Sequence, residues 1–184
     1  RLCDGAAHQG VAAFAAAHEY AEMDDIFALA ESRNESPFIV VCDSLEDPHN
    51  LGAILRSAEA AGVHGVIIPK RNSVTLNYTV AKTSAGAIEY VPVVKVANLP
   101  AAIDELKSRG VWIFGADMDG TDYTVLDYSG SIALVIGSEG KGIGRLVREK
   151  CDFIASLPMR GKINSLNASV AAGILMFEAA KHRN

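Results

Sequence analysis

The 184-residue sequence is short of cysteine: it has only Cys3, Cys42 and Cys151, which lie far apart. No Cys-x-x-Cys pair and no histidine at metal-ligand spacing accompanies them, which argues against a disulfide framework and against a zinc site. No apolar run approaches the ~20 residues of a membrane span, and the first residues lack the apolar core of a secretory signal. We therefore expect a cytoplasmic protein with no metal site and no membrane segment.

Positive charge is also scarce. Lysine and arginine number 17 against 22 acidic residues, giving a formal net charge of -5. A nucleic-acid-binding protein is usually basic, so any RNA contact must use local cations or a missing part of the protein. Hydrophobic residues make up 49% and charged residues 21%, which is close to the globular average and excludes low-complexity disorder.

Apolar strands and amphipathic helices alternate along most of the chain. Phe38–Cys42 is a largely β-branched apolar run after Pro37, typical of a buried strand. Further strands are predicted at 65–68, 90–94, 111–114, 132–136 and 153–155, and helices at 48–61, 75–85, 99–108, 143–149 and 166–182. This alternation predicts an α/β domain in which helices cover both faces of a mainly parallel sheet.

Residues 1–36 differ from the rest of the chain. The stretch from Val11 to Ala30 is rich in alanine with acidic residues between, and it predicts a linker followed by one or two short helices. The globular domain is then expected over residues 37–184. Because Arg1 is not a natural initiator, we expect the chain to be a fragment of a longer protein.

Three stretches carry polar residues and glycines that the fold does not require. The first runs from Asn50 to Arg56. Asn50 is expected near the start of the helix after the first strand, at the sheet edge where α/β proteins bind ligands. Gly52 and Arg56 are four residues apart and share a helix face, so the missing side chain leaves room beside the guanidinium. The alternative is a capping asparagine and a solvated arginine.

The second stretch is Gly137–Gly142, directly after the predicted fifth strand. It is not a P-loop, because only two residues separate its first glycine from Gly140-Lys141 and no Ser or Thr follows the lysine. What remains is a backbone that can approach a flat ligand closely, with one carboxylate, Glu139. The alternative is a glycine-rich turn with an exposed glutamate.

The third stretch, residues 157–169, joins a strand to the last helix. Asn164 or Ser165 would cap that helix, but a cap does not explain the cluster of Asn164, Ser165, Asn167 and Ser169. The helix carries a stripe of large apolar side chains and, beside it, a set of small residues. Packing within the monomer and a dimer interface are the two interpretations of the stripe, which consists of Leu166, Val170, Ile174 and Phe177.

Together the three stretches resemble the motifs of the SpoU (TrmH) family of RNA 2′-O-ribose methyltransferases, in the SPOUT superfamily. The likeness covers residues 37–183. It implies a C-terminal deep trefoil knot, S-adenosylmethionine as cofactor, and a homodimer packed through the knot and the terminal helix. The motifs, in order, are Asn50-x-Gly-x-x-x-Arg56, Val135 to Gly142, and Leu157-Pro158-Met159-x-Gly161 followed by Ser165-Leu166-Asn167-x-Ser169.

The resemblance also implies residue roles. Catalytic roles fall to Asn50, Arg56, Glu139, Ser165 and Asn167. Cofactor binding falls to Gly115, Ala116, Gly137, Gly140, Leu157, Met159 and Leu166. RNA contact would use local cations, chiefly Arg56, Lys82, Arg145 and Arg160, with Lys70, Arg71, Arg148 and Lys162 as further members.

Arg56 has the central place in the implied mechanism, since its planar fork suits the phosphate beside the target ribose. Asn50 and Glu139 would orient it, while Ser165 and Asn167 would shape the pocket. An arginine stays protonated in proteins. It would therefore either lower the pKa of the 2′-hydroxyl by its field or hold a phosphate that accepts the proton.

The choice of substrate RNA is narrowed by a further resemblance. His8-Gln9-Gly10 and the acidic stretch after it resemble the linker of bacterial 23S rRNA guanosine-2′-O-methyltransferases. Those enzymes carry a small RNA-binding domain ahead of the linker, and here that domain would be missing. A tRNA substrate and a non-catalytic RNA-binding module remain alternatives. A dinucleotide-binding oxidoreductase is disfavoured, because residues 43–46 replace the glycine fingerprint expected after the first strand.

Overall fold

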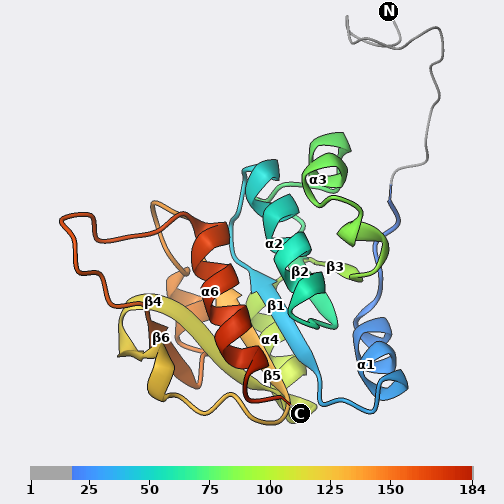
Figure 1. Cartoon of the computed structure of the whole chain (residues 1–184). Helices are drawn as coiled ribbons and strands as arrows, with labels where there is room; N and C mark the ends of the chain where they lie inside the picture. Colours follow the sequence, from blue (N-terminus) through green and yellow to red (C-terminus); the bar gives the residue numbers. More distant parts are fainter. Residues whose placement is uncertain (1–17, 184) are drawn as a thin grey trace, which may run out of the picture.

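A single parallel sheet forms the centre of the molecule (Figure 1), and the computed structural model describes residues 18–183. Its strand order is β3-β2-β1-β5-β4-β6, and every neighbouring pair is parallel. The predicted α/β class with a mainly parallel sheet is confirmed. The strands are β1 (Phe38–Cys42), β2 (Gly65–Pro69), β3 (Val93–Val96), β4 (Trp112–Asp122), β5 (Ile132–Ile136) and β6 (Phe153–Ser156).

Helices cover both faces of the sheet. One face carries α2 (Pro48–Ala60) and α6 (Ala168–Ala180), with α3 (Tyr78–Thr83) and the 3₁₀ turn η1 (Ala87–Glu89) beside α2. A second turn, η2 (Tyr123–Val125), packs at the edge of this layer. The other face carries α1 (Met23–Ser32), α4 (Leu99–Ser108) and the short α5 (Arg145–Arg148).

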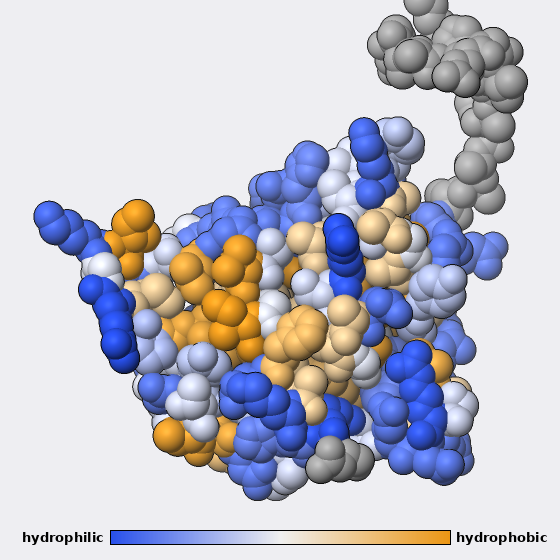
Figure 2. All heavy atoms as spheres, viewed as in Figure 1, coloured by the Kyte–Doolittle hydropathy of each residue, from blue (hydrophilic) through white to orange (hydrophobic). Residues whose placement is uncertain are grey.

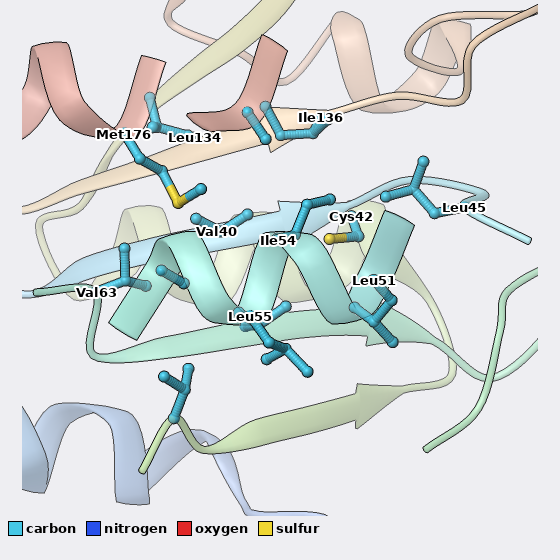
Figure 3. Packing of buried hydrophobic residues seen from close by; sticks show 14 of the residues in the cluster. Val40, Cys42, Leu45, Leu51, Ile54, Leu55, Val63, Leu134, Ile136 and Met176 are labelled. Carbon is cyan, nitrogen blue, oxygen red and sulfur yellow. The ribbon is translucent and has the colours of Figure 1, made fainter. Parts of the chain in front are cut away.

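The core is divided by β1, whose five residues are all buried. Phe38, Val40 and Cys42 face the α2/α6 layer, whereas Ile39 and Val41 face the opposite layer, as the alternation of side chains along a strand requires. Figure 3 shows Met176 of α6 and Ile54 of α2 packing over Val40 and Leu134 in the first of these layers.

The register of β1 and β5 places two loop starts side by side. Cys42 is paired with Ile136 at the carboxyl ends of the two strands. The next residue of the first strand, Asp43, donates its backbone N–H to the Ile136 carbonyl at 2.8 Å. The segments that begin at Asp43 and Gly137 therefore leave the same edge of a rigid sheet.

Several element bounds differ from the sequence prediction. The helix predicted at 75–85 is limited to Tyr78–Thr83, because Asn77 caps it by accepting a hydrogen bond from the Val80 N–H. The strand predicted at 90–94 is Val93–Val96, because the 3₁₀ turn at residues 87–89 ends in a helical C-cap at Tyr90, so the strand starts later. The helix predicted at 143–149 is the four-residue α5.

β4 runs well beyond the predicted Phe114. It pairs with β6 up to Ala116, and the register then shifts so that Thr121 and Asp122 resume the pairing. The intervening residues, 117–120, project from the ladder at the carboxyl end of the strand. They lie where the sequence predicts a ligand site.

Part of the predicted N-terminal extension packs on the domain. Ala21 forms a parallel bridge with Val94, and Ile26 of α1 is fully buried. Ile26 occupies the space that a Cβ on Gly65 would need, 2.4 Å from its side-chain carbons. Residues 1–17, including Cys3 and His8-Gln9-Gly10, lie outside the described residues. Within 18–183, no helix is long and apolar enough to cross a membrane, and Cys42 and Cys151 are free thiols.

Candidate active site at the carboxyl edge of the sheet

A cavity of about 330 Å³ lies beyond the carboxyl ends of β4, β5 and β6, and we call it the first cavity. Ala116, Ile136 and Ala155 form its wall on the sheet side. Its volume falls within the roughly 300–1,000 Å³ of small-molecule sites. Most of the residues predicted to bind a cofactor line it: Ala116, Gly137, Gly140, Leu157, Met159 and Leu166.

Gly115 is the exception among the predicted cofactor residues. It is buried in β4, and a Cβ there would lie 2.8 Å from Cys151 Sγ. Gly115 therefore permits close packing beneath the site and does not line the cavity. Three lining residues were not predicted from the sequence: Asp117 and Met118, which the register shift of β4 carries into the cavity wall, and Lys141.

The glycine loop, residues 137–142, folds back on itself. Ser138 and Gly142 exchange backbone hydrogen bonds of 2.8 and 3.2 Å, and Gly142 has a φ of +64°. A Cβ on Gly137 would lie 2.1 Å from the Gly142 carbonyl carbon, a collision between two backbones. Glycine at position 137 is thus required for this turn, which exposes a narrow backbone surface to the first cavity.

Asn50, Glu139 and Asn167 form a hydrogen-bonded cluster, although each comes from a different predicted motif. The Asn50 side-chain amide donates to Glu139 Oε1 at 3.2 Å. The Asn167 amide donates to Asn50 Oδ1 at 2.9 Å and also to Glu139 Oε1. The Ala168 N–H donates to the same carboxylate oxygen at 3.3 Å. Asn50 is only 6% exposed and Asp47 is the cap of α2, so the capping role considered for Asn50 is wrong.

Asn167 is also the N-cap of α6. Its Oδ1 accepts hydrogen bonds from the N–H groups of Ser169 and Val170. The prediction that Asn164 or Ser165 caps this helix is wrong, because the helix begins later than predicted. Asn164 and Ser165 instead line the first cavity.

Gly52 and Arg56 differ from their predicted arrangement. A Cβ on Gly52 would lie 1.8 Å from Thr83 Oγ1, so the missing side chain makes room for α3 and not for the guanidinium. Arg56 is exposed on α2 and lines neither this cavity nor its neighbour. Of the five predicted catalytic residues, Arg56 alone is outside both the cluster and the cavity walls.

The predicted RNA-binding cations are spread over the surface. Arg145 pairs with Glu149 at 2.6 Å, and Arg148 pairs with Asp117 at 2.9 Å. Arg160 is exposed in the loop that carries the cavity residue Met159. Lys82 is exposed on α3. Lys70, Arg71 and Lys162 are exposed as well.

The apolar stripe of α6 is exposed, so packing within the monomer does not explain it. Figure 2 shows hydrophobic side chains gathered over α6 and beside it. The buried side of the helix carries Ala168, Ala172 and Leu175 instead. The exposed members of the stripe are Leu166 at 36%, Val170 at 50%, Ile174 at 36% and Phe177 at 50%.

Cysteine chemistry does not fit this site. Burial, with a smaller contribution from Asp43, raises the pKa of Cys42 to about 12. Burial likewise raises the pKa of Cys151 to about 11. Neither is a thiolate near neutral pH. Among residues 18–183, no three His, Cys, Asp or Glu side chains gather as a metal site would require.

Comparison with known proteins places this geometry in context. Residues 37–177 match the model of the SpoU rRNA Methylase family. The chain is 57% identical over 178 residues to Bacillus subtilis YacO, which is assigned to the TrmH family of tRNA/rRNA methyltransferases. The aligned region covers 96% of this chain and 72% of that protein. A relative of the same assignment in Staphylococcus aureus strain MSSA476 is 54% identical over 97% of this chain and 73% of its own length.

Solved structures of SpoU/TrmH enzymes have the same fold as this chain. The SpoU methyltransferase AviRb from Streptomyces viridochromogenes, in complex with AdoMet, superposes with a TM-score of 0.75 and 31% identity. The match covers 80% of this chain, which spans 58% of the AviRb chain. A TrmH/SpoU tRNA-modifying enzyme from A. aeolicus gives a TM-score of 0.72 and 29% identity, covering 86% of this chain and 82% of that one.

Proposed function

The chain belongs to the SpoU rRNA methylase family, and from this we propose that it transfers a methyl group from S-adenosylmethionine to a ribose 2′-hydroxyl of RNA. The substrate we propose is a guanosine of 23S rRNA. One observation carries the proposal: Asn50, Glu139 and Asn167, from three separate motifs, meet in one hydrogen-bonded cluster beside the first cavity.

The first cavity suits S-adenosylmethionine. Leu157, Met159 and Leu166 supply apolar contacts for a flat heterocycle, and the glycine loop presents backbone where a Cβ on Gly137 could not fit. AviRb, which shares this fold, was solved in complex with AdoMet. When bound, the cofactor supplies an electrophilic methyl on a sulfonium, so the leaving group is already activated and no metal is needed.

The chemistry then consists of alignment and proton removal. With the cofactor bound, the 2′-oxygen would form a bond to the methyl carbon as the sulfur–carbon bond breaks to leave a neutral thioether, and the hydroxyl proton would pass to the RNA phosphate that Arg56 holds. Correct orientation alone contributes several kcal/mol to such a reaction. The Asn50–Glu139–Asn167 cluster fixes the wall of the site, and Arg56 holds the RNA phosphate while remaining protonated itself.

We propose that two copies of the chain pack through the exposed α6 stripe. Monomeric proteins rarely leave a contiguous apolar patch without a function, and the stripe continues from Phe177 at one end of α6 to Leu166 beside the first cavity. A second copy seated there would lie next to the site and would bring its own Arg56 near the target ribose. The C-terminal knot and the cytoplasmic location stay predictions.

A tRNA substrate is the second candidate, because the relatives are assigned to tRNA and rRNA methylation together. The test incubates the chain with tritiated S-adenosylmethionine and unmodified transcripts of 23S rRNA and tRNA in parallel, followed by nucleoside analysis. We expect label in a 2′-O-methylated nucleoside of the 23S transcript. Label on a base would contradict ribose methylation, and RNA binding without any transfer would favour a non-catalytic module.

A further inference from the structure

A second cavity, of about 490 Å³, lies on the other side of the glycine loop. Ser44 follows β1, Asn72 follows β2, and Ser138 follows β5, so this cavity sits over the carboxyl ends of three neighbouring strands. Ser138–Lys141 line both cavities. The two spaces therefore lie side by side along one sheet edge and are separated by a single short loop.

The second cavity differs from the first in its chemistry. Glu46, Asp47 and Glu139 supply carboxylates, Asn50 and Asn72 supply amides, and Lys141 is its one cation. One oxygen of Asp47 accepts the His49 N–H at 2.8 Å as the cap of α2. Glu46 is exposed, and within residues 18–183 it forms no hydrogen bond or ion pair. Its carboxylate therefore keeps both oxygens available for a ligand.

These groups select among ligands. Two adjacent carboxylates repel a phosphate placed between them, so the cavity does not suit the RNA backbone. A carboxylate accepts two parallel hydrogen bonds well. Guanine presents two neighbouring donors, N1–H and the N2 amino group, on its Watson–Crick edge. Adenine presents an acceptor, N1, beside its amino group, and cytosine and uracil present no pair of adjacent ring and amino donors.

We propose that the second cavity takes the base of the target nucleotide and that Glu46 selects guanine by accepting from N1–H and N2–H. The inference rests on the proposed function, because it places the base on one side of the loop and the methyl donor on the other. The ribose then lies near Asn50 and Glu139, and Lys141 meets the adjoining phosphate. Reading an unpaired base by its Watson–Crick edge is typical of enzymes that act on single nucleotides in RNA.

Nucleotide titration tests this assignment. GMP, AMP and IMP are added separately to the ¹⁵N-labelled full chain, and the backbone signals of Ser44 and Asn72 are followed by NMR. We expect GMP to bind more tightly than AMP by roughly 5- to 150-fold, the range that one bidentate base contact supplies. IMP, which lacks the N2 amino group, should fall between them.

Two variants make the test specific. Glu46→Gln replaces one accepting oxygen by an NH₂ donor, which would face the N1–H or N2–H donor of guanine. The variant should therefore lose the preference for GMP over AMP. Glu59→Gln makes the same charge change at an exposed position near the other end of α2 and should preserve the preference. Equal binding of GMP and AMP to the wild-type chain, or an unchanged preference in Glu46→Gln, would overturn the inference.

Nucleoside analysis separates this inference from the proposed function. Methyl label on the ribose of adenosine, cytidine or uridine would reject guanine selection while leaving RNA ribose methylation intact. A Glu46-dependent preference for GMP without methyl transfer to any transcript would support the base site and reject the proposed reaction. Label in 2′-O-methylguanosine alone, with that selectivity and the preference for GMP both lost in Glu46→Gln, would support both.

Discussion

Asn167 links the folding of α6 to the site, because its oxygen caps the helix while its amide nitrogen donates to Asn50 and Glu139. Asn167→Ala removes both functions, and loss of the cap alone costs about 0.5–2 kcal/mol in the free energy of unfolding. Asn167→Asp keeps the capping oxygen but turns a second carboxylate oxygen toward Glu139. We expect urea denaturation to show Asn167→Asp more stable than Asn167→Ala, and both to lose methyl transfer.

The two substitutions thus separate stability from activity at one position. If Asn167→Asp transferred methyl groups at the wild-type rate, the donated hydrogen bonds to Asn50 and Glu139 would not matter for the reaction. A circular dichroism spectrum of each variant provides the control for α6 itself.

Arg56 stands apart from the cofactor site, since it is exposed and lines neither cavity. Arg56→Ala should therefore abolish methyl transfer through loss of the proposed phosphate contact while leaving the affinity for S-adenosylmethionine within about twofold. Arg56→Lys should recover little, because an ammonium lacks the planar fork of the guanidinium. Equilibrium dialysis and turnover on RNA measure the two effects. A collapse of cofactor affinity would show that the assigned role is wrong.

Two glycines of the same loop have opposite tolerance. A Cβ on Gly137 would collide with backbone at 2.1 Å, whereas a Cβ on Gly140 would meet nothing within 4 Å. Gly137→Ala must open the turn, and we expect it to lower stability by about 1–3 kcal/mol and S-adenosylmethionine affinity at least tenfold. Gly140→Ala should retain wild-type stability. Urea denaturation and dialysis compare the pair, and equal stabilities would contradict the described turn.

At the level of the elements, the sequence predicts best where local signals agree. The bounds of β1, α4 and β5 are as predicted, since each has either a continuous apolar run or a clear cap and stop. The start of α6 is misplaced because Asn164, Ser165 and Asn167 are all good caps, and only tertiary contact with Glu139 selects Asn167. The extension of β4 has no local signal, because it depends on pairing with β6.

The stripe on α6 allows a test of the proposed association. Val170 and Phe177 are each half-exposed, so Val170→Glu with Phe177→Glu should leave the monomer folded while placing charge in the interface. We expect analytical ultracentrifugation to show a dimer for the wild type and a monomer for the double variant. Val125→Glu alters an apolar residue that is 71% exposed in η2 and serves as the control. A wild-type monomer would reject the dimer.

Over the whole molecule, the sequence order of the three motifs allowed the site to be predicted but not its details. Parallel strands bring loops 89 and 117 residues apart in sequence to one edge, as the contacts of Asn50 with Glu139 and Asn167 demonstrate. The second cavity was missed because Glu46 and Asn72 belong to no motif, and their proximity depends on the order β2-β1-β5. The spacing of Arg56 from the other motif residues along the sequence does not indicate that it lies outside both cavities.

His64 is buried at the start of the domain and forms two hydrogen bonds there. Its Nδ1 accepts the Phe38 N–H at 3.0 Å, so the neutral ring donates from Nε2 to Glu35. Nearby, Arg183 donates to the carbonyls of Gly130 and Ser36. Burial lowers the pKa of His64; Glu35 opposes this shift, whereas Arg183 and Arg33 add to it.

This lowered pKa gives the stability a pH dependence with a defined sign. The unfolded chain, with a histidine pKa near ~6.5, binds a proton that the folded chain does not. The free energy of unfolding should therefore fall as the pH drops below about 6.5, and continue to fall toward the folded pKa. Urea denaturation of the wild type and of His64→Gln between pH 8 and pH 5 measures the effect. The glutamine variant should show a shallower slope, and an identical slope would exclude His64 as its source.

The loop shared by the two cavities has a consequence for the affinity of each ligand. A ligand that fixes Ser138–Lys141 from one side sets the wall that the other ligand meets. Thermodynamic linkage then requires reciprocity: whatever factor the methyl donor contributes to nucleotide affinity, the nucleotide returns to the donor. An enzyme built in this way senses the presence of its second substrate through the first, without any distant regulatory site.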